Sequence, residues 1–351
     1  MKNKQNTLIT NDCKSSYSEF SSKLEKLKGK TLLITGGTGF LGSWVCEMVH
    51  YMNTFHKADI NLFIMARDKE RFENNFLHIK DAQFICSDIR NNIDLPKDIN
   101  YIIHAASNPD NRFHASRPFE SMTTVAEGTS AIFQSAERLS SLENIVNIGS
   151  SAVYSETLKD GESFSEDYLG PLYDNKLSNS FLEANRYSES LCAAARSELH
   201  LPIVAIRPFT FCGAYQSIDS PWAINNFIND AIHKRPIRIH GDGKVVRSYM
   251  YGSDLAIWTL IIMLNSKNGQ VYNVGSGDGY TLKEIADKVA SNFNPISSVV
   301  TNTSITHENN HSVLLPDVTK AEKEFGLRQV IGIDKSIKRT VEWHKDGLNY
   351  V

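Results

Sequence analysis

The stretch 35-TGGTGFLGSW-44 decides the fold, because three glycines recur at every third position directly after the short apolar run TLLIT. The segment WVCEMVHYM follows with the spacing of a helix. A strand, a glycine turn and a helix in this order are typical of a dinucleotide-binding unit. Gly36 permits the tight turn, Gly39 lets backbone amides approach a pyrophosphate, and Gly42 lets the helix pack closely on the strand.

Further short apolar runs alternate with helix-like segments along the chain. These runs are INLFIMA at 60–66, AQFICS at 82–87, YIIHAAS at 101–107, NIVNIGS at 144–150 and LPIVAIRPF at 201–209. Strands that alternate with helices predict right-handed βαβ units. We therefore expect an α/β fold: a Rossmann-like doubly wound parallel sheet with a smaller C-terminal substrate-binding part at the carboxyl edge of the sheet.

The pattern divides the chain into three parts. Residues 1–29 are polar and rich in Lys and Ser, and we expect an N-terminal arm with a candidate helix over 17–27. Residues 30–208 are the expected dinucleotide-binding Rossmann domain, to which a segment near 247–275 returns. Residues 209–351 are then mainly the substrate-binding part, because Gly and Pro interrupt the regular alternation there.

Composition and charge exclude several classes of protein. The net charge is −3 at pH 7, so no global attraction to nucleic acid or to a membrane surface is expected. No apolar run approaches the roughly 20 residues of a membrane-spanning helix. The five cysteines are scattered without a CxxC pair, which favours a reducing cytoplasm. The histidines and cysteines show no metal-ligand spacing, so no metal site is expected.

Several later motifs follow the glycine turn in order. They are 104-HAAS-107, 123-TTVAEGT-129, 149-GSSAVYS-155, 207-RPFTFCGAYQ-216, 247-RSYMYGSDLA-256, 272-YNVGSG-277 and 342-EWH-344. Together the motifs resemble the extended short-chain dehydrogenase/reductases and, within them, the nucleotide-sugar epimerase/dehydratase group. The resemblance implies bound NADP or NAD, a nucleotide-diphosphate sugar as substrate, and a homodimer.

The residue that follows the second apolar run, 60–66, bears on whether the cofactor is NAD or NADP. Arg67 stands where an acidic residue would bind the ribose hydroxyls of NAD, and its guanidinium can pair with a 2′-phosphate, which favours NADP. The alternative is a surface arginine beside Asp68. Asp88 is a candidate contact to the adenine. The candidate cofactor contacts are Gly36, Thr38, Gly39, Phe40, Leu41, Gly42, Arg67, Asp88, Ile89, Ala105, Ala106, Ser107 and Asn185.

The resemblance also assigns candidate substrate contacts. Ser150 takes the place of a family Ser or Thr that hydrogen-bonds a sugar oxygen at the reacting carbon, and Arg247 matches an arginine near the substrate diphosphate. Sugar 4,6-dehydratases of the family carry Asp-Glu after that Ser or Thr, whereas this chain has Ser151-Ala152, which argues against a standard 4,6-dehydratase. The candidate substrate contacts are Ser151, Thr210, Gln216, Asn226, Arg238 and Arg247.

The catalytic pair of the family is a YxxxK motif, in which the lysine lowers the pKa of the tyrosine that acts as general acid/base. Tyr187 is a nearby tyrosine, but Leu191 stands where its lysine would be. Counting back from Arg207, which matches the arginine that ends the next strand in relatives, places the pair at Phe181 and Asn185. Phenylalanine has no proton to exchange and asparagine carries no charge. Loss of general acid/base help typically costs about 10²–10⁴ in rate.

This substitution leaves several functions open. We predict epimerase or isomerase chemistry on an NDP-hexose or 4-keto-NDP-hexose. The alternatives are a catalytically dead or engineered-inactive nucleotide-sugar binder, and an NDP-sugar dehydratase or reductase that uses a different acid/base. The candidate catalytic residues are Ser150, Phe181, Asn185 and Cys212. Cys212 is either a replacement acid/base or a plain buried thiol, and Tyr215, Glu183 and Asn111-Arg112 are further candidates to face the sugar.

Overall fold

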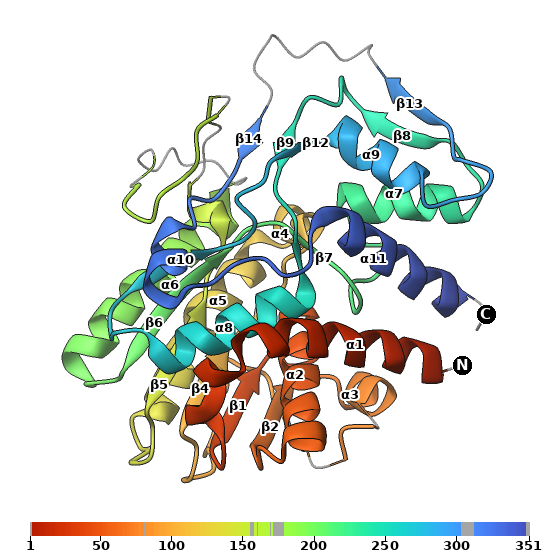
Figure 1. Cartoon of the computed structure of the whole chain (residues 1–351). Coiled ribbons are helices and arrows are strands. Elements are labelled where there is room, and N and C mark those ends of the chain that lie inside the picture. Colours follow the sequence, from red (N-terminus) through yellow and green to blue (C-terminus); the bar gives the residue numbers. More distant parts are fainter. Residues whose placement is uncertain are drawn as a thin grey trace.

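A parallel sheet of seven strands forms the centre of the molecule, in the order β11-β6-β5-β4-β1-β2-β3 (Figure 1). Its strands are β1 Thr31–Thr35, β2 Asn61–Ala66, β3 Gln83–Cys86, β4 Tyr101–His104, β5 Asn144–Ile148, β6 Ile203–Pro208 and β11 Val271–Val274. The order reverses between β1 and β4, and ligands bind at such a switch point in open α/β sheets. The expected doubly wound parallel sheet is confirmed.

The computed structural model describes residues 2–76, 78–80, 82–154, 158–159, 161–168, 170, 179–302 and 312–348. The helices are α1 Lys2–Phe20, α2 Phe40–His56, α3 Lys69–Phe76, α4 Asn111–Ser116, α5 Pro118–Ala136, α6 Ser180–Glu198, α7 Ala223–Ile232, α8 Gly252–Asn265, α9 Leu282–Ala290, α10 Thr319–Phe325 and α11 Ile333–Leu348, with 3₁₀ segments η1 Ser21–Leu27 and η2 Ser151–Tyr154. None of the described helices combines the length and the hydropathy that crossing a membrane requires.

Alternate residues of each central strand pack against opposite helical layers. In β1, Leu32 and Ile34 belong to the cluster built with α2 and α8, whereas Leu33 belongs to the cluster built with α5 and α6. Successive side chains of a strand point to opposite faces of the sheet, so an apolar run such as TLLIT must be covered on both faces. This requirement explains why the runs predicted to be strands are continuous rather than alternating.

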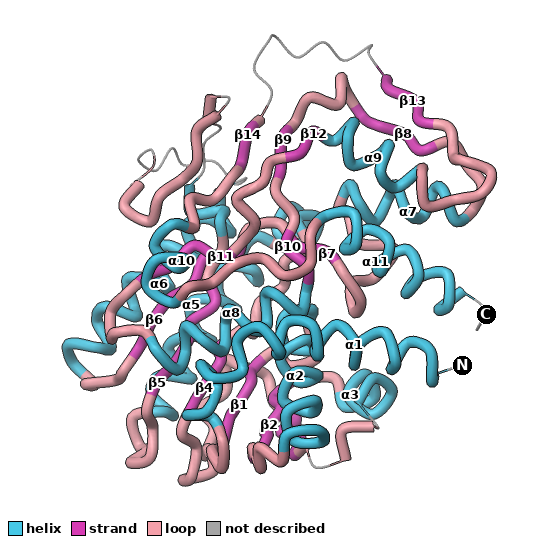
Figure 2. The backbone as a smooth tube through the Cα atoms, in the orientation of Figure 1, coloured by secondary structure: helices cyan, strands magenta, loops and turns pink. Residues whose placement is uncertain are grey.

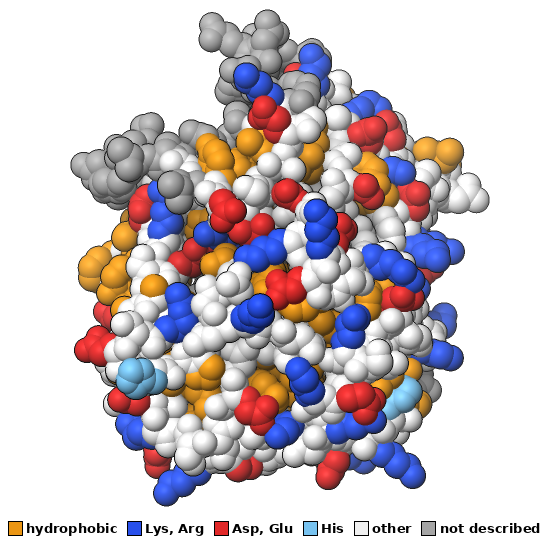
Figure 3. Space-filling model, turned by 60° about the vertical axis from the view of Figure 1, so that its left-hand side comes forward, with side chains coloured by type: hydrophobic (Ala, Val, Ile, Leu, Met, Phe, Trp, Pro, Cys, Tyr) orange, Lys and Arg blue, Asp and Glu red, His pale blue; other side chains and the backbone are white. Residues whose placement is uncertain are grey.

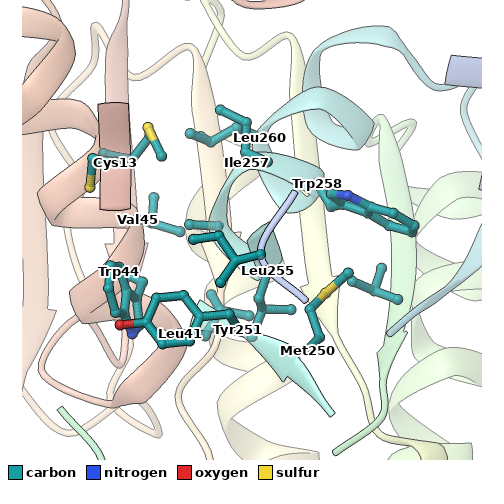
Figure 4. Close-up of a cluster of buried hydrophobic side chains, with 14 of the residues drawn as sticks. Cys13, Leu41, Trp44, Val45, Met250, Tyr251, Leu255, Ile257, Trp258 and Leu260 are labelled. Carbon is teal, nitrogen blue, oxygen red and sulfur yellow. The ribbon is translucent and has the colours of Figure 1, made fainter. Parts of the chain in front are cut away.

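Of the expected N-terminal arm, 1–29, the described residues 2–29 are largely helical and pack on the domain. Helix α1 and segment η1 bury one apolar stripe, which consists of Ile9, Cys13, Tyr17, Phe20, Leu24 and Leu27. In Figure 4, Cys13 lies beside Val45 of α2, and Trp44 of α2 faces Tyr251. The sequence does not show this stripe clearly, because most residues of α1 are polar.

Buried polar groups also fasten α1 to the C-terminal helix. Asp12 is almost fully buried, its carboxylate lies 2.8 Å from the guanidinium of Arg339 on α11, and it accepts a 2.6 Å hydrogen bond from the Tyr251 hydroxyl. Burial raises the pKa of the Asp12 carboxyl to about 6, since the charged form loses its water. Residues from both ends of the chain therefore share one buried cluster.

The C-terminal part sits beyond the carboxyl ends of the strands. It contains the short pairs β7 Phe211–Cys212 with β10 Met250–Tyr251 and β8 Ile237–His240 with β13 Val299–Asn302, and the triplet β9 Val246–Arg247, β12 Tyr280–Thr281 and β14 Val313–Leu314 (Figure 2). Between these pieces, α8 and β11 return to the main sheet, and β11 pairs with β6. On the face seen in Figure 3, acidic and basic side chains are interspersed without a field of one sign.

Candidate functional site

The turn between β1 and α2 brings backbone segments unusually close together. Gly36 has a φ of 67°, and a Cβ built on it would lie 2.5 Å from the carbonyl oxygen of Ala105 at the end of β4. A Cβ on Gly42 would lie 2.6 Å from the carbonyl oxygen of Gly36. Only glycine fits these two positions. A Cβ on Gly39, which caps α2, would have only the Gly36 oxygen within 4 Å, at 3.1 Å, so this side of the turn is open.

A cleft of about 450 Å³ lies above this turn at the carboxyl edge of the sheet. The sequence-predicted residues that line it are Gly36, Thr38, Gly39, Phe40, Arg67, Asp88, Ile89, Ala106, Ser107 and Gln216. The side chain of Leu41 is instead part of the core, and Gly42 and Ala105 support the turn from behind. The N-terminus of α2 opens into the cleft, and a helix N-terminus favours an anion. The cleft therefore fits a dinucleotide pyrophosphate.

One end of the cleft carries Asp88, the candidate contact to the adenine, and Arg67, the candidate contact to a 2′-phosphate. Arg90 donates two hydrogen bonds to Asp88, of 2.9 and 2.8 Å, and these bonds lower the pKa of the Asp88 carboxyl to about 2. Arg67 is 65% exposed, and its guanidinium lies 3.9 Å from Asp88, a loose contact from which it is free to reach another anion. The cleft thus presents both a carboxylate and an exposed cation, and the preference for NADP stays a prediction.

A buried polar atom in the other wall lacks a partner. Gln216 is 7% exposed, and its Oε1 accepts no hydrogen bond from the described residues, while its Nε2 donates weakly to the carbonyl of Phe211 at 3.5 Å. Phe211 stacks on Phe40, with ring centroids 4.5 Å apart. Buried polar atoms are normally hydrogen-bonded, so an unpaired oxygen in a cleft marks a position for a ligand or water atom.

A small polar pocket continues from the floor of the cleft, since Ala106 and Ser107 line both. Its polar walls are the side chains of His104, Thr129, Asn147, Asn185 and Ser188. Ser188 lies within hydrogen-bond distance of Asn147 (3.0 Å) and Thr129 (3.1 Å). Burial lowers the pKa of His104 to about 4. All of these polar side chains are therefore neutral at pH 7.

Phe181 and Asn185 lie on the inner side of α6, whereas Tyr187 is 52% exposed on its outer side. The amide of Asn185 donates a 2.7 Å hydrogen bond to the carbonyl of Phe181, and Asn185 is 4% exposed in the polar pocket. The ring of Phe181 stacks on His114, with centroids 3.9 Å apart and planes inclined by 17°. The placement of Phe181 and Asn185 at the catalytic positions of the family stays a prediction.

The other candidate catalytic residues lie at different depths. Ser150 follows β5 and accepts a 3.1 Å hydrogen bond from the amide of Ala152, while Ser151 is buried in η2. Cys212 is fully buried in β7, and burial raises the pKa of its thiol to about 12. A thiol that stays protonated at neutral pH is a poor base and a poor nucleophile, so this environment favours the interpretation as a structural cysteine.

The remaining substrate candidates do not line the cleft. Thr210 lies half-buried between β6 and β7, and Asn226 and Arg238 are exposed on α7 and β8. Arg247 is half-buried on β9, where its guanidinium donates to the carbonyl oxygens of Val246 (2.7 Å) and Ser312 (2.9 Å). Within the described part of the chain no carboxylate lies within ion-pair distance of Arg247, so its charge is not neutralised there by an acidic side chain.

Some cleft residues carry no signal in the sequence. Phe113, Glu120 and Thr124 enter from α4 and α5, and Phe211 and Trp222 enter from the connection that leads to α7. Two of them lie in motifs of the sequence, Thr124 in 123–129 and Phe211 in 207–216. No local motif marks Phe113, Glu120 or Trp222, because their place depends on how the connections after β4 and β6 cross above the sheet.

Comparisons with known proteins agree with this geometry. A family model described as the NAD dependent epimerase/dehydratase family matches residues 32–275. A UDP-N-acetyl-alpha-D-glucosaminuronate decarboxylase of Bacillus cytotoxicus is 26% identical over 329 residues, which cover 90% of this chain and 98% of that protein. UDP-glucuronic acid decarboxylase 2 of Arabidopsis thaliana is 24% identical over 319 residues, which cover 90% of this chain and 68% of that protein.

Solved structures share the fold over nearly the whole chain. UDP-glucose 4-epimerase of Thermotoga maritima, solved with UDP-glucose, superposes with a TM-score of 0.78 at 18% identity and covers 91% of this chain and 99% of that one. UDP-glucuronic acid 4-epimerase of Bacillus cereus, solved with UDP-glucuronic acid and NAD, superposes with a TM-score of 0.74 at 22% identity, with coverages of 91% and 99%.

The open side of the glycine turn generates the first prediction. Gly39→Val places a branched side chain where backbone amides meet the pyrophosphate, so the affinity for NAD and for NADP should fall at least about tenfold, or about 1.4 kcal/mol. Calorimetric titration of the folded variant measures this. The matched control is Gly332→Val, where a Cβ meets nothing within 4 Å. Unchanged dinucleotide affinity in folded Gly39→Val would show that the turn is not the binding site.

Proposed function

The chain belongs to the NAD dependent epimerase/dehydratase family, and on that premise we propose that it is an enzyme that modifies the sugar of a UDP-linked nucleotide sugar. The preferred reaction is epimerase or isomerase chemistry on a UDP-hexose or its 4-keto form. The observation that carries the proposal is the continuous cleft, which runs from the glycine turn to Gln216 of the C-terminal part. One cleft can then hold a dinucleotide and a sugar side by side.

The residues of the cleft suggest how the two ligands are held. The amides at Gly36–Gly39 would bind the pyrophosphate at the N-terminus of α2, and Asp88 and Arg67 would hold the adenosine ribose, with its 2′-phosphate in the case of NADP. When bound, the nicotinamide ring supplies a reversible acceptor for hydride. Asn185 would hydrogen-bond the nicotinamide ribose through its amide, without the charge that a lysine brings.

The substrate end combines one cation with neutral donors. Arg247 would bind the UDP diphosphate, since a guanidinium matches phosphate oxygens in a bidentate manner. Gln216 would accept a hydrogen bond from a sugar or ribose hydroxyl at its unpaired Oε1, and Ser150 would bond the sugar oxygen at the reacting carbon. The neighbouring Ser151-Ala152 lacks the carboxylates of a standard 4,6-dehydratase. These groups support changes of configuration more than elimination of water.

A second candidate is a nucleotide-sugar binder without catalysis. It is favoured by the neutral pair Phe181 and Asn185, because neither side chain can take over the proton transfer of the family tyrosine. In this case the cleft would keep its ligands and lose only turnover. The two candidates therefore share every binding residue and differ only in the chemical step.

Turnover separates these two candidates. The protein is incubated with NAD or NADP and, in turn, with UDP-glucose, UDP-N-acetylglucosamine and UDP-glucuronic acid, and the sugars are separated by chromatography. We expect one of these sugars to yield a product of changed configuration. Saturable binding without any product would support the binder and contradict the enzyme, and no binding of any UDP-sugar would contradict both.

Arg247→Ala tests the proposed diphosphate site, which lies outside the residues that line the cleft. We expect the affinity for UDP and for the UDP-sugar to fall roughly tenfold to a hundredfold, because a hydrogen bond to a charged group contributes about 1.5–3 kcal/mol. The affinity for the dinucleotide should stay the same. Arg328→Ala is the control, since Arg328 is exposed and pairs with Glu19 of α1. Equal nucleotide-sugar affinity in Arg247→Ala and the native protein would remove Arg247 from the diphosphate site.

We also propose that the protein is a homodimer through the outer surfaces of α5 and α6. Phe119 (81% exposed) and Met122 (39%) on α5, and Tyr187 on α6, present apolar side chains to solvent on neighbouring helices. Exposed apolar patches mark association sites, and a two-fold dimer uses the same patch twice. Phe119→Glu with Tyr187→Glu should convert the dimer to a monomer in sedimentation, whereas Phe55→Glu, on the far end of α2, should not. A native monomer would contradict the proposal.

A further inference from the structure

The position of the missing tyrosine is covered by an imidazole. Helix α4 projects His114 onto the ring of Phe181, and the two rings stack with centroids 3.9 Å apart. The same short helix carries Phe113 into the cleft, and its capping residue Asp110 lines the cleft as well. His114 does not itself line the cleft, but it follows Phe113, which does, and its ring covers Phe181 in the first turn of α6.

The imidazole is fixed at one nitrogen and unpaired at the other. His114 is 7% exposed, and its Nδ1 lies 2.7 Å from the hydroxyl of Ser121 on α5. Its Nε2 is shielded from solvent and has no hydrogen-bond partner among the described residues. A buried nitrogen without a partner costs free energy, which a ligand or water atom that bonds to it would return.

The other candidate acid/base groups are already engaged. Cys212 is fully buried, and the hydroxyl of Tyr215 donates a hydrogen bond to Glu47 on α2. Glu183 pairs with Arg186 at 3.3 Å on α6. Among these groups, the imidazole of His114 is the one that stacks on Phe181, and in the tautomer in which Nδ1 donates to Ser121 its Nε2 carries a lone pair without a partner among the described residues.

We propose that His114 takes over the proton transfer that the tyrosine of the family performs, with Nε2 as the atom that holds the proton. The inference rests on the proposed function. Oxidation of a secondary hydroxyl to a ketone removes one hydride and one proton, and the bound dinucleotide is the hydride acceptor. The neutral imidazole takes the hydroxyl proton at Nε2, directly or through one water, and becomes an imidazolium. In the return step the reduced dinucleotide would give the hydride back to the other face of the ketone, and the imidazolium gives back the proton.

The charges around His114 favour the neutral imidazole that this step needs. Burial lowers the pKa of His114, and the Asp110 carboxylate opposes this in part. Asp110 is itself paired with Arg112 at 2.7 Å. On α5, Arg117 pairs with Glu120 at 3.3 Å beside Ser121. Among the described residues, these charged side chains on α4 and α5 lie in ion pairs, as Glu183 and Arg186 do on α6, so each carboxylate that could hold the imidazole protonated has a cationic partner.

The kinetic test compares His114→Asn with a matched control. For the UDP-sugar that the native enzyme converts, kcat should fall about 10²–10⁴-fold while KM stays within a few-fold. The acid limb of the native pH profile of kcat/KM, where the imidazole becomes protonated, should disappear in the variant. The control is His233→Asn on the exposed end of α7, which should keep the native kcat and profile. Native turnover in a folded His114→Asn variant overturns the proposal.

A measurement on the native protein does not depend on the folding of a variant. Histidine labelled with ¹³C at Cε1 gives one signal per imidazole, and the His114 signal is recognised as the one broadened by a spin-labelled UDP-sugar analogue and unaffected by UDP alone. On addition of the unlabelled UDP-sugar this signal should shift, with a changed apparent pKa.

The outcomes distinguish the inference from the proposed function. A UDP-sugar that binds by calorimetry but shifts no histidine signal overturns the role of His114 and leaves nucleotide-sugar binding in place. A protein that binds no UDP-sugar at all overturns the proposed function and the inference with it. A shift together with the loss of turnover in His114→Asn supports both.

Discussion

The site depends on the close approach of two backbone segments, the turn between β1 and α2 and the residues that follow β4. Gly36 leaves no room for a side chain against Ala105, and this contact directs the N-terminus of α2 into the cleft. The same helix holds the opposite wall, because the indole of Trp44 donates a 3.1 Å hydrogen bond to the carbonyl of Ala214 and Glu47 accepts a bond from Tyr215. One helix therefore positions the candidate phosphate site and the loop that carries Gln216.

Local sequence patterns predict the strands and the glycine turn, but they do not predict all residues that form the walls of the cleft. The strands followed from apolar runs such as TLLIT, since a strand buried on both faces must be apolar at every position, and the glycine turn followed from its spacing. Helix α1 was expected as an arm because its buried stripe includes Cys13 and Tyr17 amid many polar residues. No short motif predicts that Phe113 and Trp222 line the cleft, because their position depends on how connections distant in the sequence cross above the sheet.

The neutral pair at the start of α6 changes the electrostatics of the candidate site. A lysine at position 185 would place a positive charge in the polar pocket, whereas Asn185 leaves a pocket whose polar groups, including His104, are uncharged. Without that charge the described residues of the pocket offer no cation that would stabilise a tyrosinate. If Phe181 and Asn185 hold the catalytic positions of the family, the two substitutions are therefore consistent with each other. A neutral imidazole needs no such cation to accept a proton, which makes His114 compatible with this environment.

The central claim is that one cleft holds a dinucleotide and a UDP-sugar together. A crystal structure of the protein with NAD and UDP-glucuronic acid tests this most directly. The account predicts the pyrophosphate of NAD on the amides of Gly36–Gly39, the UDP diphosphate on Arg247, and the sugar between Ser150, Phe181 and the nicotinamide. A dinucleotide bound elsewhere, or a sugar that lies away from Phe181, would contradict the account.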